Sequence, residues 1–311
     1  MGVVYQFPWE VTLIEFIQNI IADNSILRSI FVFFTQFGEA FMAVLIIGFF
    51  YWSYNKDIGR DVGINVISAE VTNSMVKNLF FRIRPYAANE TIDCLNEVEP
   101  GYDIYDMDKQ GYSFPSGHST NITTIVLSIA LKIKNNLFLA IGILLIIMVS
   151  ISRFALGVHY PTDVLFGILL GILTVTILTF LRQKISRNIL YAILVIIGSI
   201  GIVFCRSNDY YSSLGLLYGF IAGDLFESKY VNFRNTRNVL KAIIRTVFGV
   251  LIFLVITSIL KLPFSHETLE AHTYFAYLYR VFRYGLASFT VIGVYPLLFN
   301  HNILKLNDKM K

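Results

Sequence analysis

The sequence has 311 residues, of which 55% are hydrophobic and 15% are charged, and its mean hydropathy is +0.62. These values lie well outside the balance of soluble domains, so we predict an integral membrane protein. The net charge of +4 is modest, and in a membrane protein the positions of the positive residues matter more than their sum. We expect no nucleic-acid partner.

The first 27 residues are expected to form an N-terminal amphipathic segment. Residues 1–24 lack the charged start, unbroken apolar core and small-residue cleavage site of a secretory signal. A helix here would carry Phe16, Ile17 and Ile20 on one face and Glu15 and Gln18 elsewhere. This pattern predicts a helix that lies in the membrane interface and does not span the bilayer.

Nine hydrophobic segments follow, most of them close to the roughly 20 residues that a membrane span requires. They fall near residues 28–54, 57–80, 117–134, 136–152, 161–181, 188–205, 211–227, 239–260 and 280–299. We therefore predict an all-α fold with a core at residues 28–187 and additional transmembrane helices at 188–311. No autonomous soluble domain is expected.

The positive residues divide unequally between the two sides of the membrane. If successive segments cross alternately, one side receives about twice as many Lys and Arg residues, including Lys132, Lys134, Arg182 and Lys184. By the positive-inside rule this side faces the cytoplasm. The polar motifs described below then all fall on the opposite, extracytoplasmic face.

The longest polar interruption is residues 86–113, which are rich in Asp and Glu and contain the single base Lys109. It could be a lid or substrate-selecting loop, or only a solvated connector, and both interpretations stay open. Cys94 and Cys205 are the only cysteines and are expected to be unpaired thiols.

The second half of the chain carries charges in or beside apolar segments. Asp224 and Glu227 lie near a helix end, and Arg245 lies within an apolar segment. Charges inside a membrane are costly and are usually paired. We therefore predict a structural ion pair between Arg245 and either Asp224 or Glu227, in preference to a transport role.

The first motif follows one face of the helix expected at 57–80. Glu70, Asn73, Ser74 and Lys77 recur at positions i, i+3, i+4 and i+7, which puts them on a single face. This face should turn into the bundle interior and lead up to Lys77. A second cation, Arg84, follows at the same membrane face, and Pro85 ends the segment.

The second motif is the tetrapeptide at residues 115–118, directly before a helix. Ser116 is suited to cap that helix, and the free N–H groups of the following turn, which begins at Gly117, form an anion site. His118 stands beside them. On its own this tetrapeptide is a common sequence, so it gains meaning only from its neighbours.

The third motif joins Arg153, His159 and Asp163 around the expected start of the helix at 161–181. Pro161 suits the first position of a helix, which puts Asp163 in the first turn, close enough to reach back to His159. A carboxylate on one imidazole nitrogen fixes the tautomer and leaves the other nitrogen free to attack.

Together the three motifs resemble the signature of the type 2 phosphatidic acid phosphatase superfamily. The matching positions are Lys77-x6-Arg84-Pro85, Pro115-Ser116-Gly117-His118 and Ser152-Arg153-x5-His159-x3-Asp163, in the family's order with every position filled. The resemblance covers roughly residues 57–181 and implies a six-helix core. The helices beyond it exceed that core and are similar to those of longer bacterial and sphingosine-phosphate-phosphatase-like members.

The resemblance implies a phosphatase without a metal or other cofactor. His159 would be the nucleophile that forms a phosphohistidine, Asp163 would orient it, and His118 would protonate the leaving alkoxide and then activate water. The phosphoryl oxygens would be held by Lys77, Arg84, Ser116, Gly117 and Arg153.

The expected substrate is a membrane lipid phosphate, whose tail stays in the bilayer while its head group reaches the extracytoplasmic face of a bacterial plasma membrane. Candidates are phosphatidic acid, phosphatidylglycerophosphate, a polyprenyl phosphate or diphosphate, and a sphingoid-base phosphate. Two alternatives remain: a lipid phosphotransferase that uses the same phosphohistidine, and a transporter or scaffold whose phosphate site only binds.

Overall fold

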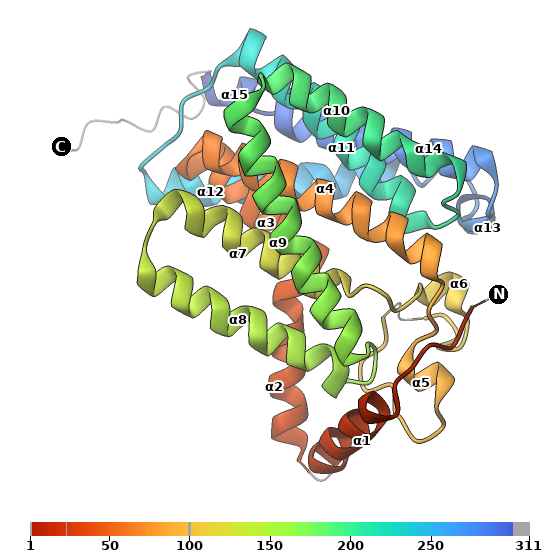
Figure 1. Cartoon of the computed structure of the whole chain (residues 1–311). Coiled ribbons are helices and arrows are strands. Elements are labelled where there is room, and N and C mark those ends of the chain that lie inside the picture. Colours follow the sequence, from red (N-terminus) through yellow and green to blue (C-terminus); the bar gives the residue numbers. More distant parts are fainter. Residues whose placement is uncertain (1, 23, 99–100, 301–311) are drawn as a thin grey trace. The chain divides into compact units, whose positions relative to one another are not determined.

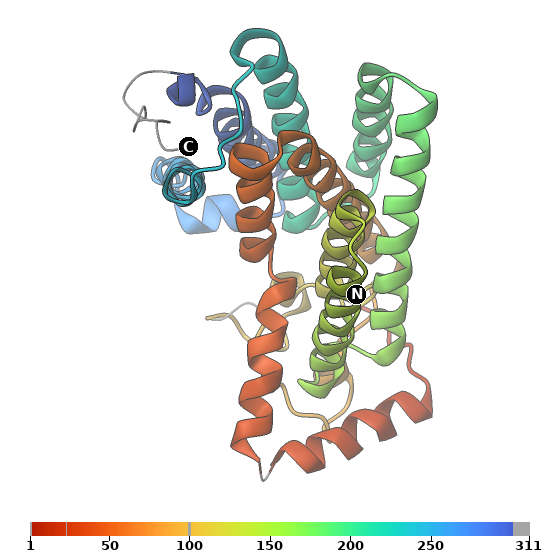
Figure 2. The same ribbon diagram turned by 90° about the vertical axis from the view of Figure 1, so that its left-hand side faces the viewer.

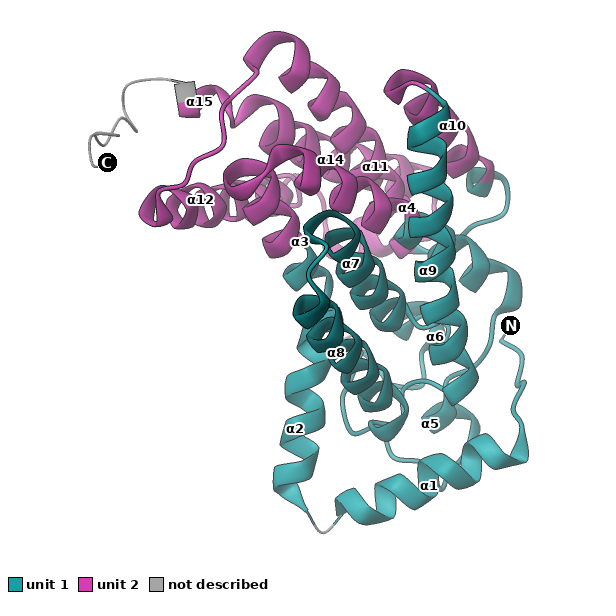
Figure 3. Ribbon diagram, turned by 60° about the vertical axis from the view of Figure 1, so that its left-hand side comes forward, with its two compact units in different colours: residues 1–43, 69–185, 201–207 teal, residues 44–68, 186–200, 208–311 magenta. Residues whose placement is uncertain are grey.

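The computed structural model describes residues 2–22, 24–98 and 101–300. Helices make up most of these residues, and no β-strand occurs among them (Figure 1, and turned by 90° in Figure 2). The described chain forms two compact units (Figure 3). Unit 1 comprises Met1–Ala43, Ala69–Ile185 and Gly201–Ser207, and unit 2 comprises Val44–Ser68, Ser186–Ile200 and Asn208–Lys311. All the motif residues belong to unit 1.

The protein is an all-α integral membrane protein, as the sequence predicts. Four helical stretches are long and apolar enough to span a bilayer: α8 (Asn136–Ala155), α9 (Pro161–Lys184), α12 (Val239–Ile259) and Tyr274–Phe299. A bent pair, Ser25–Gly38 and Ala40–Tyr54, meets at 52° and would make a fifth span. The other expected segments are also helical in the described chain, but they are shorter or less apolar than these.

The core of unit 1 is a bundle of α7 (Gly117–Ile133), α8 and α9 (Figure 1). Ile122, Val126, Ile146 and Val149 are buried together between α7 and α8. Gly142 lets the two helices approach, because a Cβ there would lie 2.4 Å from Cγ1 of Val126. This close packing fixes the ends of α7, α8 and α9, from which much of the site is built.

Helix α1 (Pro8–Ala22) lies across the end of unit 1 where α8 ends and α9 begins (Figure 2), and α2 (Ser25–Thr35) follows it. Its buried face includes Glu10, Ile14 and Gln18, whereas Phe16 is 63% exposed and Ile20 is 50% exposed. The expected amphipathic helix therefore exists, but two polar side chains lie on its inner face. The reason is that this face meets backbone groups and an arginine, which need acceptors.

The polar stretch at 86–113 is partly packed. It contains the short helices α5 (Pro85–Ala88) and α6 (Met107–Gln110). Gln18 exchanges two hydrogen bonds with the backbone of Asp93, at 2.9 and 3.0 Å, and the Leu95 N–H donates to the Leu156 carbonyl at 3.1 Å. Ile92 is buried in the same apolar cluster as Leu156. The first part of this stretch is thus docked on α1 and on the loop before His159.

Unit 2 contains α10 (Arg187–Ile200), α11 (Asn208–Phe226), α13 (His266–Glu270), α14 (Tyr274–Phe289) and α15 (Leu297–Asn300), together with α3 (Ala40–Phe49) from Val44 onward, α12, and the first part of α4 (Lys56–Phe80). Helices α11 and α14 pack backbone to backbone. A Cβ at Gly219 would lie 2.1 Å from the Gly285 carbonyl oxygen, so a glycine is required at this crossing.

The predicted ion pair of Arg245 is wrong. Asp224 accepts from Arg60 Nε at 2.6 Å, and Glu227 pairs with Lys56 Nζ at 2.8 Å. Arg245 instead donates to the carbonyls of Trp52 and Arg234, at 3.1 and 2.9 Å. Lys56 and Arg60, in the first two turns of α4, lie closer to the two carboxylates. This tertiary contact cannot be inferred from the positions of the charges along the sequence.

Candidate active site

The second motif forms the start of α7, as predicted. Ser116 is the N-cap residue, and its Oγ accepts from the Ser119 N–H at 3.4 Å and from the Ser119 hydroxyl at 3.1 Å. The Ser116 N–H donates to the Asp163 carbonyl at 3.0 Å, and Ser116 is fully buried. This bond joins the second motif to the third.

Gly117 is the first residue of α7, and the space in front of it is open. A Cβ there would meet only Oδ1 of Asn73, at 3.9 Å, within 4 Å. Asn73 in turn donates to the Thr120 hydroxyl at 3.1 Å and to the Pro115 carbonyl at 3.4 Å. The first motif thus holds the turn from one side, while the N–H groups at the helix start can receive an anion.

His159 and Asp163 lie together, as the position of Pro161 at the start of α9 predicts. Asp163 Oδ2 accepts from the Tyr160 N–H at 2.8 Å and lies 3.5 Å from Nδ1 of His159. Nδ1 is buried and makes no hydrogen bond, and the side chains are 3% and 0% exposed. Catalytic hydrogen bonds are often this long before a substrate is bound. With Nδ1 toward the carboxylate, Nε2 is the nitrogen left to react.

The surroundings of His159 favour the neutral imidazole. Burial lowers its pKa, and the positive charges of Arg84, Arg153 and Lys77 lower it further, so that the pKa lies well below the ordinary value near 6.5. His159 is therefore neutral at pH 7, with a lone pair available on one ring nitrogen. Cations from the first and the third motif therefore act on this side chain.

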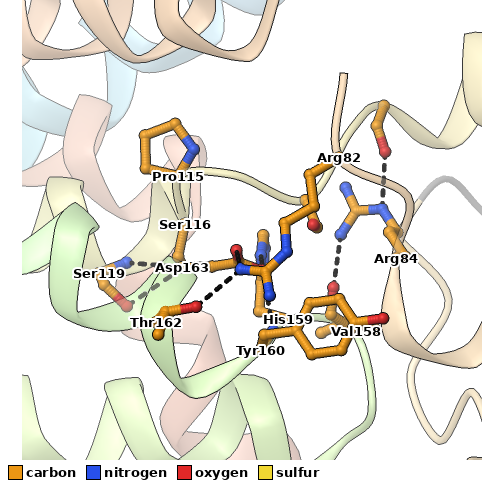
Figure 4. Close-up of polar contacts among 12 residues, drawn as sticks. Arg82, Arg84, Pro115, Ser116, Ser119, Val158, His159, Tyr160, Thr162 and Asp163 are labelled. Carbon is orange, nitrogen blue, oxygen red and sulfur yellow. Dashed lines mark hydrogen bonds and ion pairs between the residues drawn. The ribbon is translucent and has the colours of Figure 1, made fainter. Parts of the chain in front are cut away.

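Arg84 anchors the loop that precedes His159. Its Nη1 donates to the Val158 carbonyl at 3.0 Å (Figure 4), and Nε and Nη2 donate to the carbonyls of Gly111 and Gln110, both at 2.8 Å. The residue is 2% exposed. Arg84 therefore ties the end of the polar stretch to the residue next to His159, in addition to placing a positive charge there.

Arg153 offers an unused donor. It lies in the last turn of α8, is 1% exposed, and donates from Nη1 to the Thr35 hydroxyl. Its Nε is buried without an acceptor. An unsatisfied buried donor costs about 1–3 kcal/mol, so this position is suited to an anionic oxygen of a ligand. Lys77 lies in the last turn of α4 and is half-buried.

His118 has a partner that the sequence analysis missed. Its Nε2 lies 3.0 Å from Oε1 of Glu39, whose side chain is 44% exposed. Glu39 follows the turn η1 (Gln36–Gly38), and a Cβ at Gly38 would lie 2.6 Å from the His118 Cβ. The signal in the sequence is an isolated carboxylate inside the apolar stretch 28–54, because such charges usually serve a purpose.

Arg82 and Glu10 were also missed. Arg82 Nη1 donates to Asp163 Oδ1 at 2.5 Å (Figure 4), and Nη2 donates to Glu10 Oε2 at 2.8 Å. Arg82 stands between Lys77 and Arg84 in the first motif, so a third cation in that segment was a visible signal. Glu10 carried no signal, because it lies outside every motif.

The site thus combines a neutral buried histidine beside a carboxylate, a second histidine, several cations and a helix start. Among the described residues, no three His, Cys, Asp or Glu side chains are grouped as metal ligands. The arrangement can hold a phosphoryl group and exchange protons with it.

Family models assign the chain to a known superfamily. The profile of the PAP2 superfamily matches residues 59–204, and that of the PAP2 superfamily phosphatase, transmembrane extension, matches residues 211–308. The chain therefore belongs to the PAP2 superfamily, the type 2 phosphatidic acid phosphatase family that its three motifs resemble. The resemblance stated from the sequence is confirmed.

Curated relatives narrow the comparison. An undecaprenyl-diphosphatase of Sulfolobus acidocaldarius is 29% identical over 150 residues, which cover 47% of this chain and 66% of that protein. Undecaprenyl-diphosphatase BcrC of Bacillus subtilis is 28% identical over 157 residues, or 48% and 72%. Phosphatidylglycerophosphatase B of Bacillus subtilis is 36% identical over 89 residues, or 25% and 43%. No solved structure gave a significant match.

Proposed function

We propose that this protein is a lipid phosphatase that hydrolyses a phosphomonoester or diphosphate of a membrane lipid through a phosphohistidine on His159. The observation that carries the proposal is the neutral, buried His159, with Nδ1 facing Asp163 and three positive side chains nearby. This is the environment that a nitrogen nucleophile needs to attack a phosphate that carries negative charge.

In the first step Nε2 of His159 attacks phosphorus, and the bond from phosphorus to the leaving oxygen breaks. His118 donates a proton to that oxygen. The leaving group is the lipid alcohol when the substrate is a monophosphate, and the lipid monophosphate when the substrate is a diphosphate. Glu39 binds Nε2 of His118, which leaves Nδ1 for this transfer. Arg153 Nε, Lys77 and the N–H groups at the start of α7 bind the equatorial oxygens, where charge develops.

In the second step a water molecule attacks the phosphohistidine. His118, now neutral, accepts the proton of the water, the bond between nitrogen and phosphorus breaks, and orthophosphate is released. The cycle regenerates a neutral His159 and a protonated His118. One histidine therefore serves as the acid and then as the base. Without substrate, burial and the charge of Arg153 lower the pKa of His118 to about 4, although Glu39 acts in the opposite direction. The negative charge of a bound phosphate raises this pKa, so we propose that His118 takes up its proton together with the substrate.

The relatives suggest which lipids to test first. Two of them are named for undecaprenyl diphosphate and one for phosphatidylglycerophosphate. We propose that the substrate belongs to this range of long-chain lipid phosphates, at the extracytoplasmic face of a plasma membrane. The unequal distribution of Lys and Arg supports this orientation.

The direct test is release of orthophosphate by the purified protein in detergent, across polyprenyl, diacyl and sphingoid-base phosphates. We expect release from at least one of these lipids, and release at the background level by His159→Ala. Transfer of the phosphate to a second lipid, with no orthophosphate, would instead make the protein a phosphotransferase. The same assay on right-side-out and inside-out vesicles tests which face of the membrane carries the active site. We expect faster phosphate release from substrate added to right-side-out vesicles.

Chelation is expected to leave turnover unchanged. Lys77, Arg84 and Arg153 supply the positive charge that a metal ion supplies in other phosphatases. Phosphate release measured with and without EDTA checks this expectation, with a metal-dependent phosphatase as the positive control for chelation. Loss of turnover on chelation, restored by an added divalent cation, would contradict it.

The pH profile should report the charges around His159. Because its pKa lies well below 6.5, the imidazole stays neutral as the pH falls through 6.5, and the acidic limb of kcat/KM should lie below that value. Lys77→Met removes one of the cations that lower this pKa, so the acidic limb should move to higher pH. Lys109→Met, the same change in the polar stretch, should leave the limb in place. An unmoved limb in Lys77→Met would show that this charge does not act on the nucleophile.

A further inference from the structure

Arg82 is held at the centre of a buried polar network. Its side chain is 5% exposed, and each of its three nitrogens donates a hydrogen bond. Nη1 donates to Asp163 Oδ1 at 2.5 Å and to the Thr162 hydroxyl at 2.7 Å, Nη2 to Glu10 Oε2 at 2.8 Å, and Nε to the Tyr5 carbonyl at 2.6 Å. The guanidinium also lies over the ring of Tyr160, 4.0 Å from its centroid (Figure 4).

Glu10 completes the network from α1. It is fully buried, and Oε1 accepts from the Thr162 N–H at 3.1 Å and from the Thr162 hydroxyl at 2.5 Å. The Thr162 N–H belongs to the first turn of α9, where backbone donors have no partner within the helix. A carboxylate at this helix start is also favoured by the helix dipole. Glu10 therefore binds both Arg82 and the helix that carries Asp163.

Val3 holds the backbone on either side of Arg82 in an isolated β-bridge. The Val3 N–H donates to the Phe81 carbonyl at 2.8 Å, and the Ile83 N–H donates to the Val3 carbonyl at 3.0 Å. These two bonds are made by the residues directly before and after Arg82, so they fix the position of its backbone. The N-terminal segment thus contacts Arg82 through its backbone near Val3, through Tyr5 and through Glu10.

The consequence for Asp163 is a fixed carboxylate. Arg82 binds Oδ1, the Tyr160 N–H binds Oδ2, and Oδ2 is the oxygen that faces Nδ1 of His159. Without Arg82 the carboxylate would keep its hydrogen bonds with the Tyr160 N–H and the Ser113 side chain, but it would be a buried charge with no cation in contact. The orientation of the imidazole depends on that carboxylate.

We infer that Arg82 and Glu10 are positioning residues for the nucleophile, because Glu10 holds Arg82 and Arg82 holds the Asp163 carboxylate against His159. This inference rests on the proposed function. It makes the N-terminal helix part of the site, although α1 lies outside all three motifs. Neither residue contacts the reacting atoms; both act through Asp163.

The test uses the full-length protein with the best substrate of the lipid panel and compares Arg82→Gln, Glu10→Gln and the control Glu15→Gln. Glu15 is on the same helix and accepts from the Thr91 hydroxyl at 2.5 Å, outside this network. We expect kcat to fall ~10²-fold in Arg82→Gln and less in Glu10→Gln, since misplacement of a reacting group by about 1 Å costs this much. KM and competitive inhibition by orthophosphate should stay within about threefold, because the cations that bind phosphate remain. Glu15→Gln should equal the wild type.

A double-mutant cycle separates positioning from general stabilisation. In an Asp163→Asn background the carboxylate that Arg82 positions is already gone, so adding Arg82→Gln should lower kcat by less than about threefold. Arg82 acting only on stability would cost the same factor in both backgrounds. If Arg82→Gln fails to fold, Arg82→Lys and Glu10→Gln provide the comparison.

The possible results are distinct. Normal kcat in the Arg82 and Glu10 variants, or equal losses with and without Asp163, would overturn the inference while an active wild type upholds the proposed function. A wild type that releases no more orthophosphate than His159→Ala from any lipid would overturn the proposed function and, with it, the inference.

Discussion

Replacing His159 with alanine should reduce kcat more than any other single change in the site. The variant loses the nitrogen that forms the covalent intermediate, and deletions of this kind cost on the order of 3 to 8 kcal/mol of barrier. The fold should survive, because the removed side chain makes no hydrogen bond through Nδ1. Orthophosphate release from the best lipid substrate, at saturating concentration, measures the loss.

Two comparisons make this result specific. His266→Ala changes an exposed histidine on α13 and should keep full activity. Rapid quenching of the wild type with substrate labelled at the transferred phosphate should trap label on the protein in an acid-labile, base-stable form, and His159→Ala should trap none. Full phosphatase activity in His159→Ala would refute its role as the nucleophile.

The parts of the site that sequence could predict are those whose geometry is local. Ser116 caps α7 and Asp163 reaches back to His159 because a helix start sets the spacing of three or four residues. The face that runs through Asn73 and Ser74 is buried for an equally local reason, the helical repeat. Such relations hold whatever the rest of the chain does.

The partners that sequence could not predict come from distant segments. Glu39 reaches His118 across 79 positions of sequence, and Glu10 reaches Arg82 across 72. Their chemistry was visible, but the tertiary packing that selects each pair was not. The same limit explains the wrong pairing of Arg245, whose guanidinium found carbonyl acceptors while Arg60 took Asp224.

The inner face of α1 shows how a hydrophobic pattern can mislead in a membrane protein. In water the apolar face of a helix turns inward, but beside lipid no such preference operates. Here Glu10 and Gln18 turn inward because backbone donors and Arg82 require them, and Phe16 stays exposed. The predicted interfacial position of α1 is compatible with this exposed apolar face.

His118→Ala should slow the two chemical steps unequally, and the leaving group should reveal which step suffers more. Loss of a general acid and base typically costs 10²–10⁴-fold. A lipid monophosphate needs a proton on its leaving alkoxide, whereas a lipid diphosphate leaves as a phosphate, which is a weak base and needs little help. In the second step water attacks the phosphohistidine, and His118 is needed to accept its proton with either substrate.

With a diphosphate substrate, His118→Ala should therefore form the phosphohistidine and fail to hydrolyse it. We expect a burst of one lipid monophosphate per protein molecule, followed by steady-state turnover at least about 10²-fold slower than that of the wild type. The phosphate label should stay on His159. With the corresponding monophosphate the burst should disappear. Glu39→Gln, which keeps a hydrogen-bond acceptor near Nε2 but removes the charge, should retain the burst and lose less steady turnover. Equal slowing of both substrates without trapped label would place His118 outside proton transfer, because only a group that acts on the leaving oxygen and then on water predicts the difference.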